Sequence, residues 1–104
     1  MTGPTLSVGR GVIVEVARSA ALEVPGVLRV ARAGPAWRSF FLGPAVAVRT
    51  HADRVDVRLW VIARPGARLA AVGAETRAAV AGAIERLLGL NLGSVTVIVD
   101  GIGG

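Results

Sequence analysis

The strongest constraint on the fold is one long run of apolar residues at helical spacing. It covers residues 69–88, between a turn at residues 64–67 and Gly89, a natural C-terminal helix cap. Arg86 lies in the last turn, where a cation complements the negative end of the helix dipole. A helix with one apolar stripe has to bury that stripe against a second layer. The stripe consists of Leu69, Val72, Thr76, Ala79, Val80, Ala83, Ile84, Leu87 and Leu88.

Segments in which apolar and polar residues alternate predict that second layer, because half-buried strands alternate in this way. The clearest covers residues 54–63, preceded by a strand at 45–50 and the hairpin connection at 51–53. Residues 94–100 alternate again, and we expect the tail at 101–104 to fray. One face of the sheet is therefore buried and the other is partly open. In the long strand the buried face holds Val55, Val57, Leu59 and Val61, and the open face holds Arg54, Asp56, Arg58, Trp60 and Ile62.

The N-terminal part predicts a first helix and short strands. Apolar residues recur at helical spacing over residues 10–24. Pro25 ends this helix, because proline lacks a backbone donor and disfavours the α conformation in the residue before it. Gly26 takes the turn without steric cost. Short strands are predicted at residues 27–31 and 6–8.

These elements predict a single α+β domain over residues 1–104. The economical arrangement is a two-layer sandwich, with two helices packed on one face of a small mixed sheet of three to four strands. The strand order stays open, because the last strand can pair beside either strand of the hairpin.

The sequence offers no visible catalytic apparatus. His51 is the one histidine, and a hairpin turn gives it neither a positioned partner nor a cleft. The carboxylates fall mostly on polar faces beside arginines, such as Asp56 between Arg54 and Arg58, which indicates surface pairing. There is no cysteine, no metal-ligand spacing and no lysine for a P-loop. We therefore predict a protein that is not an enzyme, with no cofactor, metal or small-molecule substrate.

The charge of the chain is strongly basic. The net charge is +5 and every basic residue is arginine. Such a balance fits an anionic partner such as nucleic acid or an acidic lipid surface. It also fits GC-rich coding, which the dispersal of the arginines along the chain favours. The longest uncharged run, residues 87–99, is too short to span a bilayer, and the N-terminus has no apolar signal region.

A loop predicted at residues 33–44 is the first candidate contact surface. It contains Trp37, Arg38, Phe40 and Phe41. Aromatic side chains beside an arginine are typical of interface anchors, membrane contacts and nucleic-acid stacking platforms. The same loop can instead fold back and cap the open end of the core.

The open sheet face is the second candidate. Trp60 lies there beside Arg58, with Arg49, Thr96 and Ile98 nearby, and a tryptophan on an otherwise polar face marks a self-association or partner surface. The alternative is that the N-terminal segment or the loop at 33–44 covers this face.

Three phrases of the sequence follow one another in a familiar order. They are AALEVPGV at 20–27, VDVRLWVIARPGARL at 55–69 and AIERLLGLNLGSVTVIVDGI at 83–102. In order and spacing they resemble the bacterial alkaline shock protein family, also called the general-stress or envelope-stress family. There a first helix runs into Ala-Leu-x-Val-x-Gly-Val, and a strand, turn and second helix lead to a closing strand with a terminal Gly-Ile. The resemblance covers about residues 6–102.

The resemblance implies a small cytoplasmic bacterial domain without known enzymatic activity, linked to stress tolerance and cell-envelope homeostasis. Some members sit at the membrane through a separate membrane-anchored partner, and others have been connected to fatty-acid metabolism. The family has no catalytic motif, so no catalytic residue is carried over. This chain departs from the pattern in using arginine where lysine and glutamate are usual, and aromatic residues at 37–42 where a polar, basic segment is usual.

We therefore predict a non-catalytic scaffold or interaction protein of the envelope stress response, in the cytoplasm or at the inner face of the membrane. It acts as a homo-oligomer or by docking to a membrane-anchored protein partner. The alternative is a small basic nucleic-acid-binding domain that uses arginines and exposed aromatic residues. The predicted contact residues are Trp37, Arg38, Phe40, Phe41, Arg58 and Trp60.

Overall fold

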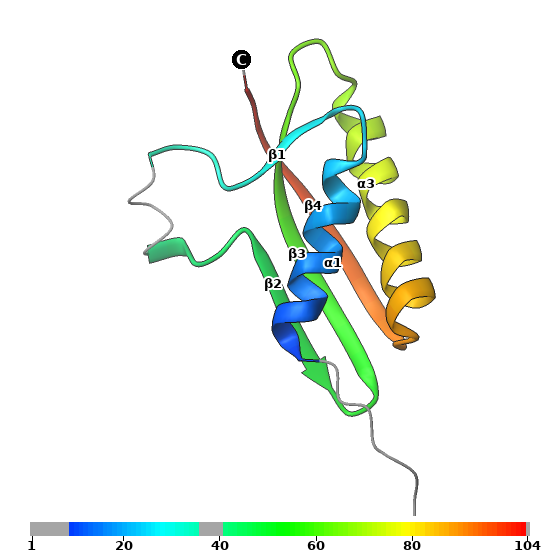
Figure 1. Ribbon diagram of the computed structural model, residues 1–104. Helices are drawn as coiled ribbons and strands as arrows, with labels where there is room; N and C mark the ends of the chain where they lie inside the picture. The colour runs from blue at the N-terminus through cyan, green and yellow to red at the C-terminus, as the bar shows by residue number, and fades with distance from the viewer. Residues whose placement is uncertain (1–8, 36–40, 104) are drawn as a thin grey trace, which may run out of the picture.

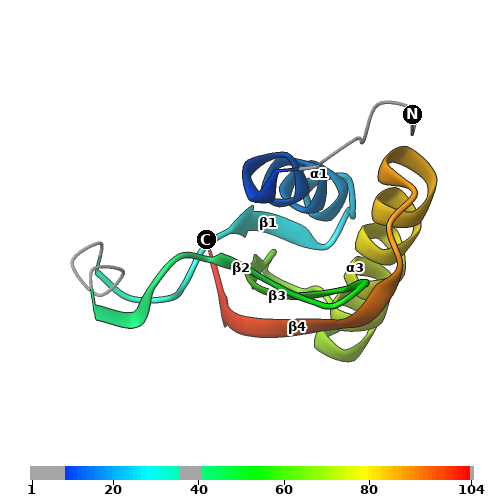
Figure 2. The same cartoon turned by 90° about the horizontal axis from the view of Figure 1, so that it is seen from below.

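A computed structural model describes residues 9–35 and 41–103. Two helices lie side by side on one face of a four-stranded sheet (Figures 1 and 2). This is the predicted two-layer α+β sandwich. The elements are α1 (Arg10–Leu22), β1 (Val27–Val30), β2 (Val46–His51), β3 (Arg54–Ala63), α3 (Leu69–Ala83), the π-helical turn η1 (Ile84–Leu88) and β4 (Leu92–Ile102).

The long strand β3 is the centre of the sheet. β1 and β2 pair with it in antiparallel fashion along the same edge, one beyond the other. β4 pairs parallel along the opposite edge, from Leu92 beside Val55 to Ile102 beside Ala63. α3 makes the crossover that a parallel pair requires. The sheet is therefore mixed, as predicted, and the open question of strand order is decided: the last strand joins β3.

The core lies between the helix layer and the inner face of the sheet. β3 contributes Val57, Leu59 and Val61, which are buried beneath both helices. Burying one such side chain contributes roughly 1.5–3 kcal/mol. From α1, Ala17 and Ala21 are fully buried, and such small side chains let the helix backbone approach the sheet closely. The alternation of β3 thus predicts its inner face correctly.

The turn after α1 forms where the sequence predicts it, but its causes are not the ones expected of Pro25 and Gly26. α1 ends at Leu22, and tight backbone bonds from Glu23 to the carbonyl of Ala20 and from Val24 to that of Ala21 close the turn before Pro25. Gly26 does not have a positive φ. A Cβ at Gly26 would lie 2.5 Å from Cγ2 of Val72. The glycine is therefore required by the close approach of α3.

The C-terminal tail contradicts the prediction that it frays. Gly101 and Ile102 continue β4 beside Ile62 and Ala63. The backbone N–H of Gly103 then donates to the carbonyl of Ala63 at 2.9 Å. A Cβ at Gly103 would collide with Leu28, so the absence of a side chain lets the tail pack against the sheet. Gly104 lies outside the described residues.

The other boundaries match the predictions closely. β3 has the predicted limits, while β2 continues through His51, so that Ala52 and Asp53 alone form the hairpin turn. Ala52 has φ +54° in this turn. The long helix ends in η1, and Gly89 follows with φ +63°, as expected of a C-terminal cap. The strand predicted at residues 6–8 lies outside the described residues.

Candidate interaction surface on the open sheet face

The face of the sheet opposite the helices carries the most distinctive group of side chains. β3 places Asp56, Arg58 and Trp60 on this face, in the alternation that the sequence predicts. Ile62 belongs to the same face but is only 3% exposed, in contradiction to the open position expected from the sequence. It lies against Gly101 and Gly103 of the tail, which cover this end of the sheet.

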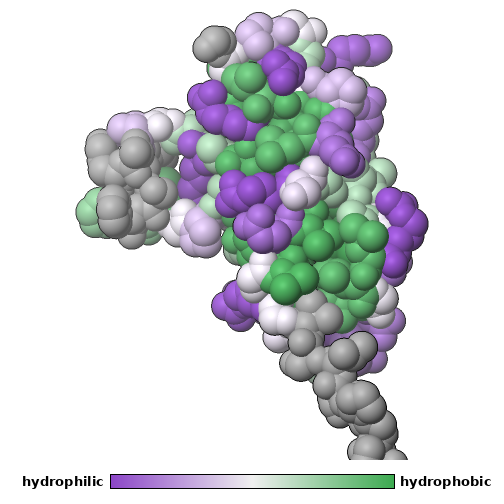
Figure 3. Space-filling model, viewed as in Figure 1, coloured by the Kyte–Doolittle hydropathy of each residue, from purple (hydrophilic) through white to green (hydrophobic). Residues whose placement is uncertain are grey.

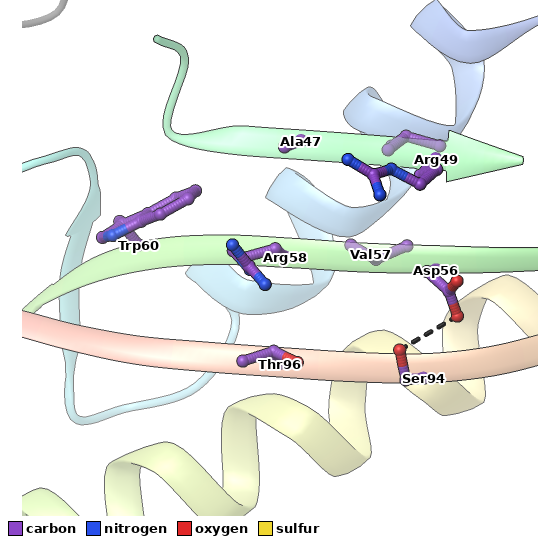
Figure 4. A pocket seen from close by; sticks show the side chains of 9 residues that line it. Ala47, Arg49, Asp56, Val57, Arg58, Trp60, Ser94 and Thr96 are labelled. Atoms are coloured by element: carbon purple, nitrogen blue, oxygen red, sulfur yellow. Dashed lines mark hydrogen bonds between the residues drawn. The ribbon is translucent and has the colours of Figure 1, made fainter. Parts of the chain in front are cut away.

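A hollow of about 320 Å³ opens on the remaining part of this face, and we call it the open-face hollow (Figure 4). Ala47, Ser94 and Thr96 are small, so they form its floor. Figure 4 shows Trp60 towards one end of the hollow and Arg49 towards the other, with Arg58 on the middle strand between Ala47 and Thr96. The full lining is Ala47, Val48, Arg49, Asp56, Val57, Arg58, Trp60, Ser94 and Thr96.

Trp60 is held in place by a second arginine. The guanidinium carbon of Arg32 lies 3.6 Å from the centroid of the Trp60 ring, a close cation–π contact. Nε of Arg32 also donates to the carbonyl of Gly43 at 3.1 Å, which fixes the arginine across the loop. Trp60 lines the open-face hollow whereas Arg32 does not. One part of the indole is therefore covered by the chain itself and another faces the hollow.

The carboxylates on this face are engaged by neutral donors. Oδ1 of Asp56 accepts a hydrogen bond of 2.9 Å from the hydroxyl of Ser94. It does not pair with Arg54 or Arg58 as the sequence indicated. Oδ2 of Asp100 accepts a hydrogen bond of 2.7 Å from the backbone N–H of Ala33.

The two arginines that line the hollow have no bonded partner among the described residues. In the part of the chain that the structure describes, Arg49 and Arg58 make no hydrogen bond or ion pair through their side chains. Both side chains are exposed. The hollow holds these two cations and one carboxylate, Asp56, which lies opposite Arg49 and bonds to Ser94, so its lining keeps a net positive charge that favours an anionic ligand.

The predicted contact residues fall into two groups. Trp37, Arg38 and Phe40 lie outside the described residues. Phe41 is 80% exposed on the segment that follows them. Arg58 and Trp60 lie together at the open-face hollow. The structure thus groups Arg58 with Trp60, whereas Phe41 does not line the hollow.

Sequence reasoning missed three residues of this surface. Arg32 was not singled out, because its contact with Trp60 joins the segment after β1 to β3, and no local pattern signals that pairing. Ala47 and Ser94 are small residues on strands, and their value as the floor of a hollow depends on large neighbours on β3. Alternation could have placed both on the open face, since Ala47 pairs with Arg58 and Ser94 pairs with Asp56.

The helix layer presents apolar patches of its own. Viewed from this side, Figure 3 shows apolar surface in two areas with a band of polar side chains between them. Val12 and Leu22 of α1 are 50% and 48% exposed, and Leu69 and Leu87 are 43% and 70% exposed. Glu15, Glu23 and Arg86 interrupt this surface. None of the described helices is long and apolar enough to cross a membrane.

The described residues bring no cluster of histidine, aspartate and glutamate side chains together on either face. His51 is exposed at the end of β2. Among the described residues, no three histidine, aspartate or glutamate side chains lie close enough together to hold a metal ion. The open-face hollow combines a concave shape, positive charge and an aromatic surface, and these are properties of binding sites.

Solved structures with the same fold are variants of the MamM CTD. A double variant aligns with a TM-score of 0.65 at 18% identity, covering 90% of this chain and 95% of the other. A variant in its manganese form gives 0.65 at 19% identity, covering 89% and 99%. A variant in its zinc form gives 0.66 at 18% identity, covering 90% and 87%. At this identity the likeness shows the fold alone.

Family membership comes from the sequence. No curated protein matches the chain in sequence. The profile of the alkaline shock protein family, described as having a cell envelope-related function, matches residues 3–103 and so takes in both helices and all four strands. This confirms the resemblance found in the three phrases. The chain belongs to the alkaline shock protein family.

Proposed function

We propose that the protein is a non-catalytic interaction domain of the cell-envelope stress response. It works in the cytoplasm or at the inner face of the membrane, through self-association or by docking to a membrane-anchored protein. The observation that carries this proposal is the open-face hollow, where Trp60 is fixed by Arg32 and flanked by the unpaired Arg58. The family's cell envelope-related function supports it.

The rigidity of Trp60 lowers the free-energy cost of binding at this surface. Association loses side-chain freedom, so a surface whose large side chains are already fixed loses less on binding. Trp60 is fixed in this way by the stacked guanidinium of Arg32. Tryptophan and arginine are also the residue types that most often dominate the energy of protein interfaces. The open-face hollow therefore has the composition and the rigidity of a binding surface.

The test is the oligomeric state of the wild type and of Trp60→Ala, measured by size-exclusion chromatography with light scattering. We expect an oligomer for the wild type and a shift of Trp60→Ala towards monomer at equal concentration. Leu87→Ala is the matched control, because Leu87 is 70% exposed on the helix side. We expect it to assemble as the wild type does. A monomeric wild type would remove self-association and leave a pull-down from the native host to identify the docking partner.

A nucleic-acid-binding function is the second candidate. The net charge of +5 and the unpaired arginines beside Trp60 favour it. Such binding would weaken steeply with salt, because phosphate contacts release counterions. Titration of a labelled single-stranded oligonucleotide at low ionic strength tests it, and no binding there would exclude it.

A further inference from the structure

The charge pattern of the open sheet face restricts what can occupy it. Asp56 and Asp100, the carboxylates placed on this face, are already hydrogen-bonded to Ser94 and to the backbone of Ala33. Arg49 and Arg58 line the hollow without a hydrogen bond or ion pair among the described residues, and they outnumber the one carboxylate in the lining, Asp56. A neutral or basic occupant would leave these guanidinium groups unpaired while removing water from them, which is unfavourable. The arginines on or beside this face are Arg29, Arg32, Arg49, Arg54 and Arg58.

The spacing of two arginines matches an extended chain. Arg58 lies opposite Ala47, and Arg49 lies opposite Asp56, so Arg49 and Arg58 are diagonal neighbours on adjacent strands. Diagonal neighbours are about 7–8 Å apart. In an extended peptide, side chains on one face recur every second residue, about 6.8 Å apart. Carboxylates at alternate positions of an extended segment can therefore reach both guanidinium groups.

The rest of the hollow accommodates such a segment. Ala47 and Thr96 leave room beside Arg58 for the segment's backbone and short side chains. Trp60, two residues after Arg58 on the same strand, presents indole surface for an apolar side chain next to the acidic ones. We propose that the open-face hollow binds an extended acidic segment of a partner protein, with alternate carboxylates on Arg49 and Arg58 and an apolar side chain against Trp60. This inference rests on the proposed function, because it names the partner chemistry of the same surface.

Two other anionic partners fit the same surface less well. Single-stranded nucleic acid binds by stacking successive bases on several aromatic side chains. In the described part of the open face Trp60 is the one aromatic residue, and Arg32 already covers part of its ring. An anionic membrane presents a broad, nearly flat surface. Such a surface does not fill a hollow of about 320 Å³ between side chains, whereas an extended peptide does.

The experiment uses a defined probe, a fluorescein-labelled decapeptide of sequence Glu-Ser-Glu-Ser-Val-Ser-Glu-Ser-Glu-Ser, which in extended form places its glutamates and its valine on the same face. Fluorescence anisotropy at low ionic strength measures its affinity for the full chain. We expect Arg49→Gln and Arg58→Gln each to weaken binding about fivefold, equivalent to about 1 kcal/mol for one exposed charge pair. Arg10→Gln is the matched control, because Arg10 is exposed at the start of α1, and we expect no change. Circular dichroism verifies that every variant is folded.

Each outcome decides the inference. Binding of the glutamate peptide, with loss for its glutamine analogue and for both sheet variants, supports it. Equal weakening by Arg10→Gln would overturn it, because the charge effect would then be unspecific. Tighter binding of a single-stranded oligonucleotide or of anionic phosphatidylserine vesicles, sensitive to the sheet variants, would overturn it in favour of those ligands. No peptide binding by a protein whose Trp60-dependent assembly is intact would overturn the inference and leave the proposed function standing.

Discussion

At some positions of this protein a glycine is needed because a neighbouring side chain fills the space that a Cβ would occupy. At others a residue is needed for the contacts that its side chain makes. Gly26 admits Cγ2 of Val72 from α3, and Gly103 admits the side chain of Leu28. Neither glycine has a positive φ, so neither is explained by backbone freedom. Arg32 shows the opposite case, because its guanidinium is held both by the ring of Trp60 and by the carbonyl of Gly43. At this scale, contacts between distant segments decide the identity of the residue.

The substitution Gly26→Ala tests this interpretation. The added Cβ would lie 2.5 Å from a methyl group of Val72, a stiff β-branched side chain, so the packing between α3 and the turn has to shift. We expect a loss of about 1–3 kcal/mol in the free energy of unfolding. Gly11→Ala is the control, because nothing lies near its Cβ position in α1, and we expect a gain of about 0.5 kcal/mol. Urea denaturation measures both, and an unchanged midpoint for Gly26→Ala would contradict the interpretation.

Among the elements, α3 and β4 are joined both by packing and by a side-chain hydrogen bond. α3 packs against β4, and Nε of Arg77 donates to the carbonyl of Val95 at 3.1 Å. That bond satisfies one backbone acceptor on the free edge of the sheet, which otherwise resembles a template for pairing with another chain. Thr76, beside it in sequence, is completely buried, and its hydroxyl has no hydrogen-bond partner. On α3, Arg77 therefore stabilises the contact with β4, whereas the unpaired hydroxyl of Thr76 lowers the stability of the fold.

Thr76→Val is expected to stabilise the protein. Valine keeps the β-branched shape and removes a hydroxyl that is buried without a partner. We expect the free energy of unfolding to rise by about 1 kcal/mol. Thr50→Val, at an exposed position on β2, is the control and should change stability by less than about 0.5 kcal/mol. A destabilised Thr76→Val would show that the hydroxyl finds a partner, such as a buried water.

The two faces of the molecule differ in composition. The helix side encloses the core, and its exposed apolar area is broken by charged side chains (Figure 3). The open sheet face gathers arginines around Trp60, and no ion pair forms among the charged side chains that the structure describes. The chain has a net charge of +5, and the arginines that gather on this face form no ion pair among the described residues. Self-repulsion among like charges destabilises a compact state and is reduced by salt.

Stability is therefore expected to increase with ionic strength. Sodium chloride screens repulsion among the arginines, while the described residues have no ion pair to lose. We expect the thermal midpoint to rise by about 2–4 °C, corresponding to roughly half a kcal/mol in a domain of this size. Differential scanning calorimetry at low and moderate salt measures it. Arg49→Gln and Arg58→Gln together should reduce the salt effect, and a midpoint that falls with salt would contradict this account.

The sequence by itself determined the elements and the faces of this protein. The period of residues 69–88 and the alternation of 54–63 predicted α3 with η1 and the two sides of β3, because those patterns express local backbone geometry. The missing catalytic motifs, the exposed aromatic residues and the family resemblance predicted binding rather than catalysis, which stays a proposal. Tertiary structure alone decided that β4 pairs with β3, that the glycine tail is ordered, and that Arg32 fixes Trp60. Each of these contacts joins segments that are far apart in the sequence, and such contacts produce no local sequence pattern from which they could be predicted.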